Sequence, residues 1–311
     1  GLFTGKTVIV TGGGKATLKD GSAGSIGYGI DIALQEGANL VITGRNVAKL
    51  EAAKESLEAE YGVKVLPVQA DVSAGQDNEA VVQNVIDKAI EEFGRIDAVV
   101  NNAQASASGV TIADHTMDQF NLAIYSGLYA TYLYMQKAIA PEGDQGSVVN
   151  FASGAGLFGN YGQCSYAAAK GIRGLTRVAA NEWGKDGINV NIVCPLAWTA
   201  ALENFQDAYP EAFKANVHMP PAAYGDVEKE IGRVVVQLCG PDFKYMNGET
   251  VTLEGGMGHG QELRRFTKRR NGPTLRGRQG DNLSFKEGGM QKVYAALFQG
   301  TLLALAGFRC R

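Results

Sequence analysis

The sequence lacks the cysteine and histidine spacings of disulfide-rich or zinc-binding proteins. Its four cysteines and three histidines are scattered over 311 residues, and no two cysteines form a CxxC motif. Scattered thiols are typical of a reducing compartment, because small secreted domains concentrate their cysteines in disulfides. These absences predict a cytoplasmic protein that holds no metal.

Long apolar runs are also absent. No stretch approaches the roughly 18 consecutive apolar residues that a membrane helix requires. The first residues, GLFTGKTVIV, lack the basic and then apolar pattern of a signal peptide. Hydrophobic residues make up 45% of the chain and charged residues 20%, which is ordinary for a soluble globular protein. We therefore expect a soluble protein with no membrane partner.

The net charge changes sign along the chain. From residue 259 onward eleven Lys/Arg stand against three Asp/Glu, a net charge of +8, whereas the residues before them carry −11. We expect a folded domain over 1–258 and a basic C-terminal extension over 259–311. Basic runs bind nucleic acid or anionic lipid in some proteins. We favour instead a solvated extension or one that packs across a subunit interface, and expect no nucleic-acid partner.

Short apolar runs alternate with helix-like segments along the chain. Segments such as NVAKLEAAKESLEAEYG repeat apolar residues at helical spacing, and this alternation is typical of βαβ units. Continuously apolar strands indicate a sheet covered on both faces. The sequence predicts an α/β, Rossmann-type doubly wound parallel sheet with helices on both faces and about seven strands, in TVIV, NLVITGR, KVLPVQADV, IDAVVNNA, GSVVNFAS, INVNIVCP and ETVTLEGG.

Residues after these strands could form a nucleotide site, because ligands of such sheets bind beyond the carboxyl ends of the strands. The first strand leads into TGGGKATLKDGSAGSIGYGI, which fits a phosphate-binding turn at a helix N-terminus and equally a flexible surface loop. Arg45 ends the second strand without a nearby acid, which favours the 2′-phosphate of NADP over NAD; a solvated surface charge is the alternative. Asp71 and Asn101 end the next two strands.

Ser153, Tyr166 and Lys170 form the sharpest candidate for catalysis. The spacing of YAAAK places the phenol and the ammonium on one face of a helix. A nearby lysine favours the tyrosinate and so lowers the pKa of the phenol. Such a tyrosine exchanges a proton with an alcohol oxygen, and Ser153, at a strand end, could hold the same oxygen. A surface Tyr–Lys pair is the alternative.

These motifs, in this order, resemble the short-chain dehydrogenase/reductase family. The matching segments TGG…SIG, ADV, NNA, YAAAK and NIVCP…T lie between residue 5 and about residue 258. The resemblance implies an NAD(P)-dependent alcohol dehydrogenase or ketoreductase and a homotetramer. It implies Tyr166 as acid/base, Ser153 orienting the substrate oxygen, and Lys170 binding the nicotinamide ribose. We expect NADP (NADPH) rather than NAD, held by Gly12, Ser25, Ile26, Gly27, Arg45, Asp71, Val72, Asn101, Ala103, Tyr166, Lys170 and Thr199.

Longer segments carry a closer resemblance. NNAQASASG, NFASGAGLFGN and PDFKYMNGETVTLEGGMG are similar to NADP-dependent 12α-hydroxysteroid dehydrogenases of bile-acid-metabolising gut bacteria. This implies a bile-acid substrate and a role in steroid and lipid metabolism. Apolar and aromatic residues between 196 and 224 suit a large flat substrate; a lid that packs on itself explains them equally well. The predicted substrate contacts are Gln104, Ser153, Phe158, Tyr166, Trp198 and Phe205.

The chain departs from the family's pattern in several places. Gln104 follows NNA where a glycine is usual, and Gly127 stands near the position of the asparagine that completes the family's tetrad. Ser126 or a water is a candidate substitute for that asparagine. KGIRGL is one residue shorter than usual, which shifts a helical face by about 100° unless it is absorbed locally. Lys15 and Lys19, within the long glycine loop, are candidates to help Arg45 hold a 2′-phosphate.

Two other functions stay open. A 3-oxoacyl-thioester reductase of the same family would need a basic surface for an acyl carrier, and no basic cluster lies in the predicted site loops. A catalytically weak NADP-binding sensor would fit the missing asparagine, but the intact Ser153, Tyr166 and Lys170 argue against it.

Overall fold

The structure, a computed structural model, describes residues 1–73, 75–107, 109–139 and 146–257. The predicted basic extension over 259–311 lies outside the described residues, as does Cys310.

Seven parallel strands form one sheet, in the order β3-β2-β1-β4-β5-β6-β7. This order reverses between β1 and β4, which is the arrangement of a doubly wound sheet. The predicted strands are therefore confirmed, as β1 (Thr7–Thr11), β2 (Asn39–Gly44), β3 (Lys64–Gln69), β4 (Ala98–Asn101), β5 (Ser147–Phe151), β6 (Asn189–Pro195) and β7 (Thr250–Leu253).

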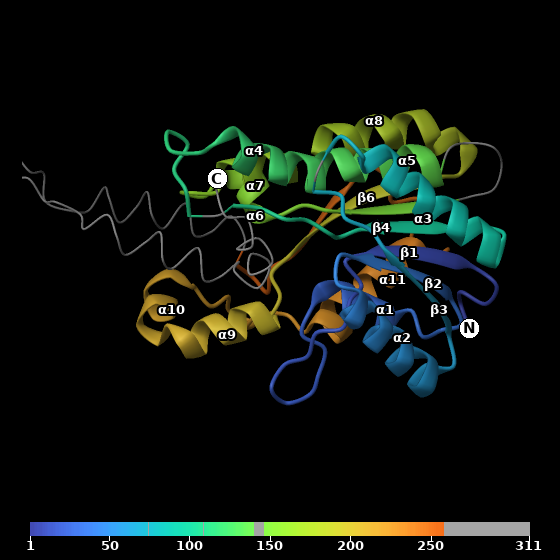
Figure 1. The fold of residues 1–311 in the computed structure, drawn as a ribbon, viewed down its shortest axis with the longest axis horizontal. Coiled ribbons are helices and arrows are strands. Elements are labelled where there is room, and N and C mark those ends of the chain that lie inside the picture. The colour runs from blue at the N-terminus through green and yellow to red at the C-terminus, as the bar shows by residue number, and fades with distance from the viewer. Residues whose placement is uncertain (74, 108, 140–145, 258–311) are drawn as a thin grey trace, which may run out of the picture.

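Helices cover both faces of the sheet (Figure 1). One face carries α1 (Ile26–Ala33), α2 (Val47–Tyr61) and α11 (Arg233–Cys239), and the other carries α3 (Asn78–Phe93), α5 (Ala130–Ala138) and α8 (Arg173–Trp183).

The core has two layers because successive strand residues point to opposite faces. Val8 and Val10 of β1 belong to the layer under α1 and α11, whereas Ile9 belongs to the layer under α3 and α5. All three side chains are fully buried, which explains why the strands are continuously apolar.

The remaining helices lie beyond the sheet's carboxyl edge or connect its layers. Helices α9 and α10 project from the body of the molecule (Figure 1). The bounds are α4 (Met117–Ala123), the π-helix η1 (Ile124–Tyr129), α6 (Gly154–Phe158), α7 (Cys164–Lys170), the 3₁₀-helix η2 (Gly184–Asp186), α9 (Ala200–Ala208), α10 (Pro210–Asn216) and the π-helix η3 (Val227–Gly232).

A helix break absorbs the missing residue of KGIRGL. Helix α7 ends at Lys170, Gly171 is its C-cap, and α8 begins at Arg173. The two helices are thus separate, so the face of α7 that carries Tyr166 and Lys170 is set independently of α8.

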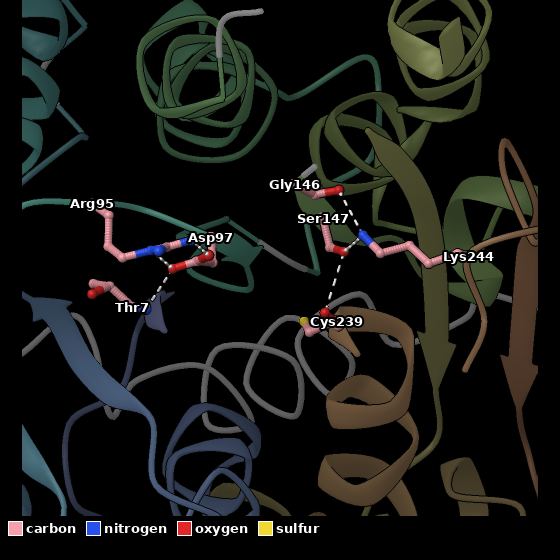
Figure 2. A network of polar contacts seen from close by, with 7 residues as sticks. All are labelled: Thr7, Arg95, Asp97, Gly146, Ser147, Cys239 and Lys244. Atoms are coloured by element: carbon pink, nitrogen blue, oxygen red, sulfur yellow. Dashed lines mark hydrogen bonds and ion pairs between the residues drawn. The ribbon is translucent and has the colours of Figure 1, made fainter. Parts of the chain in front are cut away.

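Polar contacts close the opposite, amino-terminal edge of the sheet (Figure 2). Asp97 accepts a hydrogen bond from the backbone N–H of Thr7 (2.8 Å) and pairs with Arg95. Lys244 donates to the hydroxyl of Ser147 (3.2 Å), which donates to the carbonyl of Cys239. These bonds tie the start of β1 to that of β4, and the start of β5 to the end of α11.

Within the described ranges no helix has the length and apolar character needed to cross a membrane. Over the same ranges, no cluster of three or more His, Cys, Asp or Glu side chains could hold a metal ion.

Candidate active site

A tight turn after β1 forms the first wall of the site. Gly12 has a left-handed φ of 77°, a conformation that favours glycine. A Cβ on Gly27, in the first turn of α1, would collide with the carbonyl of Gly12. The two ends of the glycine-rich segment therefore meet at the N-terminus of α1, as a phosphate-binding turn requires.

The residues between these ends form a short hairpin. Thr17 and Ala23 pair in an antiparallel bridge. Lys19 pairs with Asp207 of α9, and Lys15 donates to the hydroxyl of Ser56 on α2 (2.5 Å). Both lysines have protein partners in this structure, and their roles as ligands of a 2′-phosphate stay predictions.

Ser25 and Thr199 serve in local structure. The hydroxyl of Ser25 donates to the Gly14 carbonyl (3.4 Å) within the loop, and Ile26 begins α1 with its side chain against the core. Thr199 is the N-cap of α9, where its hydroxyl accepts from the N–H of Leu202 (3.4 Å). Their predicted contacts with a cofactor stay predictions.

Thr11 joins the turn after β1 to the loop after β4. Its hydroxyl accepts hydrogen bonds from the N–H groups of Asn102 and Ala103, both at 2.9 Å. The amide of Asn102 donates back to the Thr11 carbonyl (2.9 Å). Asn101 lies deeper, where its amide donates to Asn150 of β5 (2.9 Å). The motif NNA therefore braces the strand ends on either side of the switch point.

A cavity of about 290 Å³ opens at this switch point. It is the place at which ligands of doubly wound sheets bind. The predicted cofactor residues that line it are Gly12, Arg45, Asp71, Val72, Asn101 and Ala103. Arg45 is exposed there, and its carbonyl accepts from the amide of Gln69 (3.0 Å). Asp71 accepts from the N–H and the hydroxyl of Ser73.

This cavity fits a dinucleotide. Gly12 of the glycine turn lines it, and a side chain on Gly27 would have no room against Gly12, so backbone can approach a pyrophosphate closely. A cation, Arg45, stands at the end of β2, where a 2′-phosphate would be held.

The structure brings Ser153, Tyr166 and Lys170 together. Ser153 is the N-cap of α6, directly after β5, and Tyr166 and Lys170 lie one turn apart on α7. Ser153 hydrogen bonds with the phenol of Tyr166. The ammonium of Lys170 lies 5.7 Å from the centre of the Tyr166 ring and donates to the Phe151 carbonyl (2.7 Å). Gly156 permits the close approach of α6, because a Cβ there would lie 2.6 Å from the Lys170 carbonyl.

The pKa of Tyr166 is raised, whereas the sequence predicted that Lys170 would lower it. Burial of the phenol is the main cause, and the hydrogen bond from Ser153 acts in the opposite direction. The prediction is wrong because burial of the phenol is the dominant influence on its pKa. Burial also lowers the pKa of Lys170 to about 8. Both shifts favour the neutral forms of the pair.

The lid aromatics pack largely on one another. Trp198 meets Phe213 and Tyr224 edge-on, with ring centres 6.1 and 6.0 Å apart. Phe205 is only 2% exposed and lies against Tyr209 and Phe213. Packing of the lid on itself thus explains the burial of Phe205. Phe158, at the end of α6, is 40% exposed. The substrate contacts of Phe158, Trp198 and Phe205 stay predictions.

Two features were missed from the sequence. The hairpin's contact with α9 is one, and the place of the Gln104 side chain is the other: its carboxamide lies against Gly127 of η1. The unusual residues Gln104 and Gly127 were the available signal for the second feature. A sequence does not show, however, that two residues 23 positions apart touch.

Known proteins resemble this chain over most of its length. A family model described as enoyl-(acyl carrier protein) reductase matches residues 21–258. A 12α-hydroxysteroid dehydrogenase of a Clostridium species is 62% identical over 262 residues, which are 83% of this chain and 98% of that protein.

Solved structures share the fold. Levodione reductase superposes with a TM-score of 0.72 at 31% identity, over 84% of this chain and 99% of that one. A short-chain dehydrogenase of Burkholderia cenocepacia in complex with NADP gives a TM-score of 0.69 at 28% identity, over 82% and 99% of the two chains. These matches agree with the parallel sheet, the glycine turn at α1 and the group of Ser153, Tyr166 and Lys170. The chain therefore belongs to the short-chain dehydrogenase/reductase family.

Proposed function

We propose that the protein is an NADP-dependent oxidoreductase that interconverts a secondary alcohol and a ketone. The observation that carries this proposal is the meeting of Ser153, Tyr166 and Lys170, in a sheet whose switch point holds a cavity lined by Gly12 and Arg45. When bound, NADP would accept the hydride in the oxidation direction, and NADPH would supply it in the reduction direction. A relative solved with NADP and Arg45 at the end of β2 support NADP over NAD.

Tyr166 then acts as the acid/base. In the oxidation direction its phenolate takes the hydroxyl proton of the alcohol, and in the reduction direction the phenol gives a proton to the ketone oxygen. Ser153, which hydrogen bonds with Tyr166, holds the same substrate oxygen. Because burial raises the pKa of Tyr166, the neutral phenol dominates at neutral pH. We therefore expect oxidation to accelerate and reduction to slow as the pH rises.

The substrate that we propose is the 12α-hydroxyl group of a bile acid. The support is the 62% identity with a 12α-hydroxysteroid dehydrogenase, together with the aromatic lid of Trp198, Tyr209 and Tyr224. A steroid offers a large flat apolar surface to such a lid.

Absorbance at 340 nm tests both parts of the proposal. The enzyme is mixed with NADP or NAD and with bile acids that differ only at carbons 3, 7 and 12. We expect reduction of NADP with every substrate that carries a 12α-hydroxyl group. Turnover of a bile acid without that group would contradict the regiochemistry, and equal rates with NAD would contradict the cofactor preference.

A 3-oxoacyl thioester is the second candidate substrate. A 3-oxoacyl-(acyl carrier protein) reductase of Staphylococcus aureus is 30% identical over 78% of this chain. The acidic net charge of residues 1–258 opposes docking of an acidic carrier. Oxidation of NADPH by a 3-oxoacyl thioester, faster than by a 12-oxo bile acid, would favour this candidate.

We also propose a cytoplasmic homotetramer with a separate basic extension over 259–311. Cys164, Cys194 and Cys239 are free thiols, as suits a reducing compartment. The family model ends at residue 258, where the charge changes. Light scattering of the full chain and of a chain ending at residue 258 would test the assembly and the role of the extension.

A further inference from the structure

His115 hydrogen bonds with a serine of the helix that carries Tyr166. Its Nε2 lies 2.9 Å from the hydroxyl of Ser165, which is fully buried and directly precedes Tyr166 on α7. The other ring nitrogen, Nδ1, is also buried and has no hydrogen-bond partner among the described residues. The imidazole thus makes its hydrogen bond to the helix of the proposed acid/base, and the proposed reaction does not use it.

Helix α7 needs support at its first turn. It is seven residues long, and helices this short are marginal in water by themselves. Its N-cap, Gln163, makes no side-chain hydrogen bond to the first turn. At the other end Lys170 donates to the Phe151 carbonyl (2.7 Å), so that end is tied to β5 separately. Contacts from outside the helix therefore have to hold the turn that carries Tyr166.

Residues 109–115, which we call the strap, supply these contacts. The backbone N–H of the first strap residue donates to the Gly162 carbonyl (2.8 Å). Val110 pairs with Gln163 in a parallel bridge. These two contacts hold the chain just before α7. The bond from His115 is the third, and it reaches into the first turn of the helix itself.

His115 is itself held in place on both sides. Thr116, the next residue, is the N-cap of α4, and its hydroxyl accepts from the N–H of Gln119 (3.2 Å). The Gln119 side chain accepts in turn from the N–H of Thr116 (3.0 Å). On the other side, the hydroxyl of Thr111 donates to the Asp114 carboxylate (2.6 Å). Since α4 also packs beside α7 (Figure 1), the imidazole approaches α7 from a braced segment.

The bond to Ser165 fixes the rotation of α7 about its own axis. Successive residues of a helix lie about 100° apart around the axis, so Ser165 and Tyr166 face different sides. Ser165 faces the strap, whereas the phenol of Tyr166 hydrogen bonds with Ser153. The phenol oxygen lies further from the axis than the backbone, so a small rotation moves it more than any Cα atom. A misplacement of about 1 Å can slow a reaction about a hundredfold.

We propose that His115 is a positioning residue: by holding Ser165 it keeps the Tyr166 phenol at the substrate oxygen. This role rests on the proposed function and deepens it. In oxidation the hydroxyl proton goes to Tyr166 and the hydride to NADP, and the imidazole takes part in neither transfer. His115 does not line the cofactor cavity. Loss of its bond should therefore slow the proton transfer and leave the binding of both ligands intact.

A matched pair of variants tests this role. In His115→Gln the amide nitrogen can take the place of Nε2, whereas His115→Met has a similar length without a strong hydrogen-bonding group. We expect His115→Met to lower kcat about tenfold to a hundredfold, with KM and the Kd for NADPH within about twofold of the wild type. His115→Gln should retain at least about a third of the kcat, because it keeps the bond. Equal kcat values for the two variants would overturn the inference.

Ser165 gives a second test, which separates positioning from stability. Ser165→Ala should lower kcat as much as His115→Met, and the two changes together should lower it no further, because both remove the same bond. Each single change leaves a buried polar group unpaired and should lower the denaturant midpoint of unfolding, whereas the double change removes both groups and should raise the midpoint again. A double variant that recovered kcat together with stability would contradict the positioning role.

The two proposals fail in different ways. If the wild type oxidises no bile acid, the substrate proposal fails, and the variants are compared on any secondary alcohol that the wild type oxidises. If it oxidises none, the proposed function fails, and amide hydrogen exchange still tests the bond. Peptides that cover residues 162–168 should exchange faster in His115→Met than in the wild type and His115→Gln. Equal exchange in all three proteins would show that His115 does not hold the first turn of α7.

Discussion

At the scale of single residues, the Tyr166 hydroxyl carries the reaction that we propose. Tyr166→Phe removes the proton donor and acceptor but keeps the ring that faces Lys170. We expect kcat to fall by about 10²–10⁴, while the Kd for NADPH, followed by its fluorescence, stays within about twofold. A variant that kept most of its turnover would assign the acid/base role to another group.

Arg45 is the residue on which cofactor choice should depend. Arg45→Asp replaces a partner of the 2′-phosphate by a partner of the ribose hydroxyls. A charge-assisted hydrogen bond contributes about 1.5–3 kcal/mol. We therefore expect the ratio of kcat/KM with NADP to that with NAD to fall at least about tenfold. Steady-state rates with both cofactors give the ratio, and an unchanged value would mean that other groups hold the phosphate.

At the scale of elements, close packing of α1 on η3 depends on a glycine. A Cβ on Gly29 would strike the Val227 carbonyl. We expect Gly29→Ala to lower the free energy of unfolding by about 1–3 kcal/mol, measured by denaturant titration. Gly174→Ala is the matched control, because nothing lies within 4 Å of a Cβ there on α8. It should raise stability by up to about 1 kcal/mol. Equal effects of the two changes would contradict the packing argument.

Regular elements were predictable and their mutual contacts were not. The strands were visible because burial on both faces demands continuous apolar runs, such as those of β1 and β6. Ser153, Tyr166 and Lys170 were visible because strand ends and helical spacing fix them locally. The raised pKa of Tyr166 depends on burial by distant segments, and the meeting of Gln104 with Gly127 depends on a loop anchored by Ser126. No local pattern encodes either.

At the scale of the whole molecule, Asp31 makes stability depend on pH. The carboxyl group lies fully buried under the glycine turn, without a hydrogen-bond partner among the described residues. Burial raises its pKa well above 3.8. The folded state thus keeps a proton that the unfolded state releases above about pH 3.8, and stability falls as the pH rises from there toward the folded pKa.

Asp31→Asn removes this dependence. We expect the variant to be about as stable as the wild type near pH 3.8 and more stable by about 1–3 kcal/mol at pH 8. Denaturant unfolding at both pH values, with Asp71→Asn as an exposed control, measures the difference. If the difference in free energy of unfolding between variant and wild type did not grow with pH, Asp31 would titrate normally.

The hairpin between Gly12 and Gly27 bears on the order in which ligands bind. The Gly24 carbonyl accepts from the first N–H of α9 (2.8 Å), and the N–H of Lys19 donates to Glu203 (3.0 Å). A ligand that orders the glycine turn would therefore also order α9, which carries the predicted substrate contact Phe205. We expect a compulsory sequence of addition, cofactor first and alcohol second. Product-inhibition patterns would reveal this order. The reduced cofactor should compete with the oxidised cofactor, whereas the ketone should not compete with the oxidised cofactor.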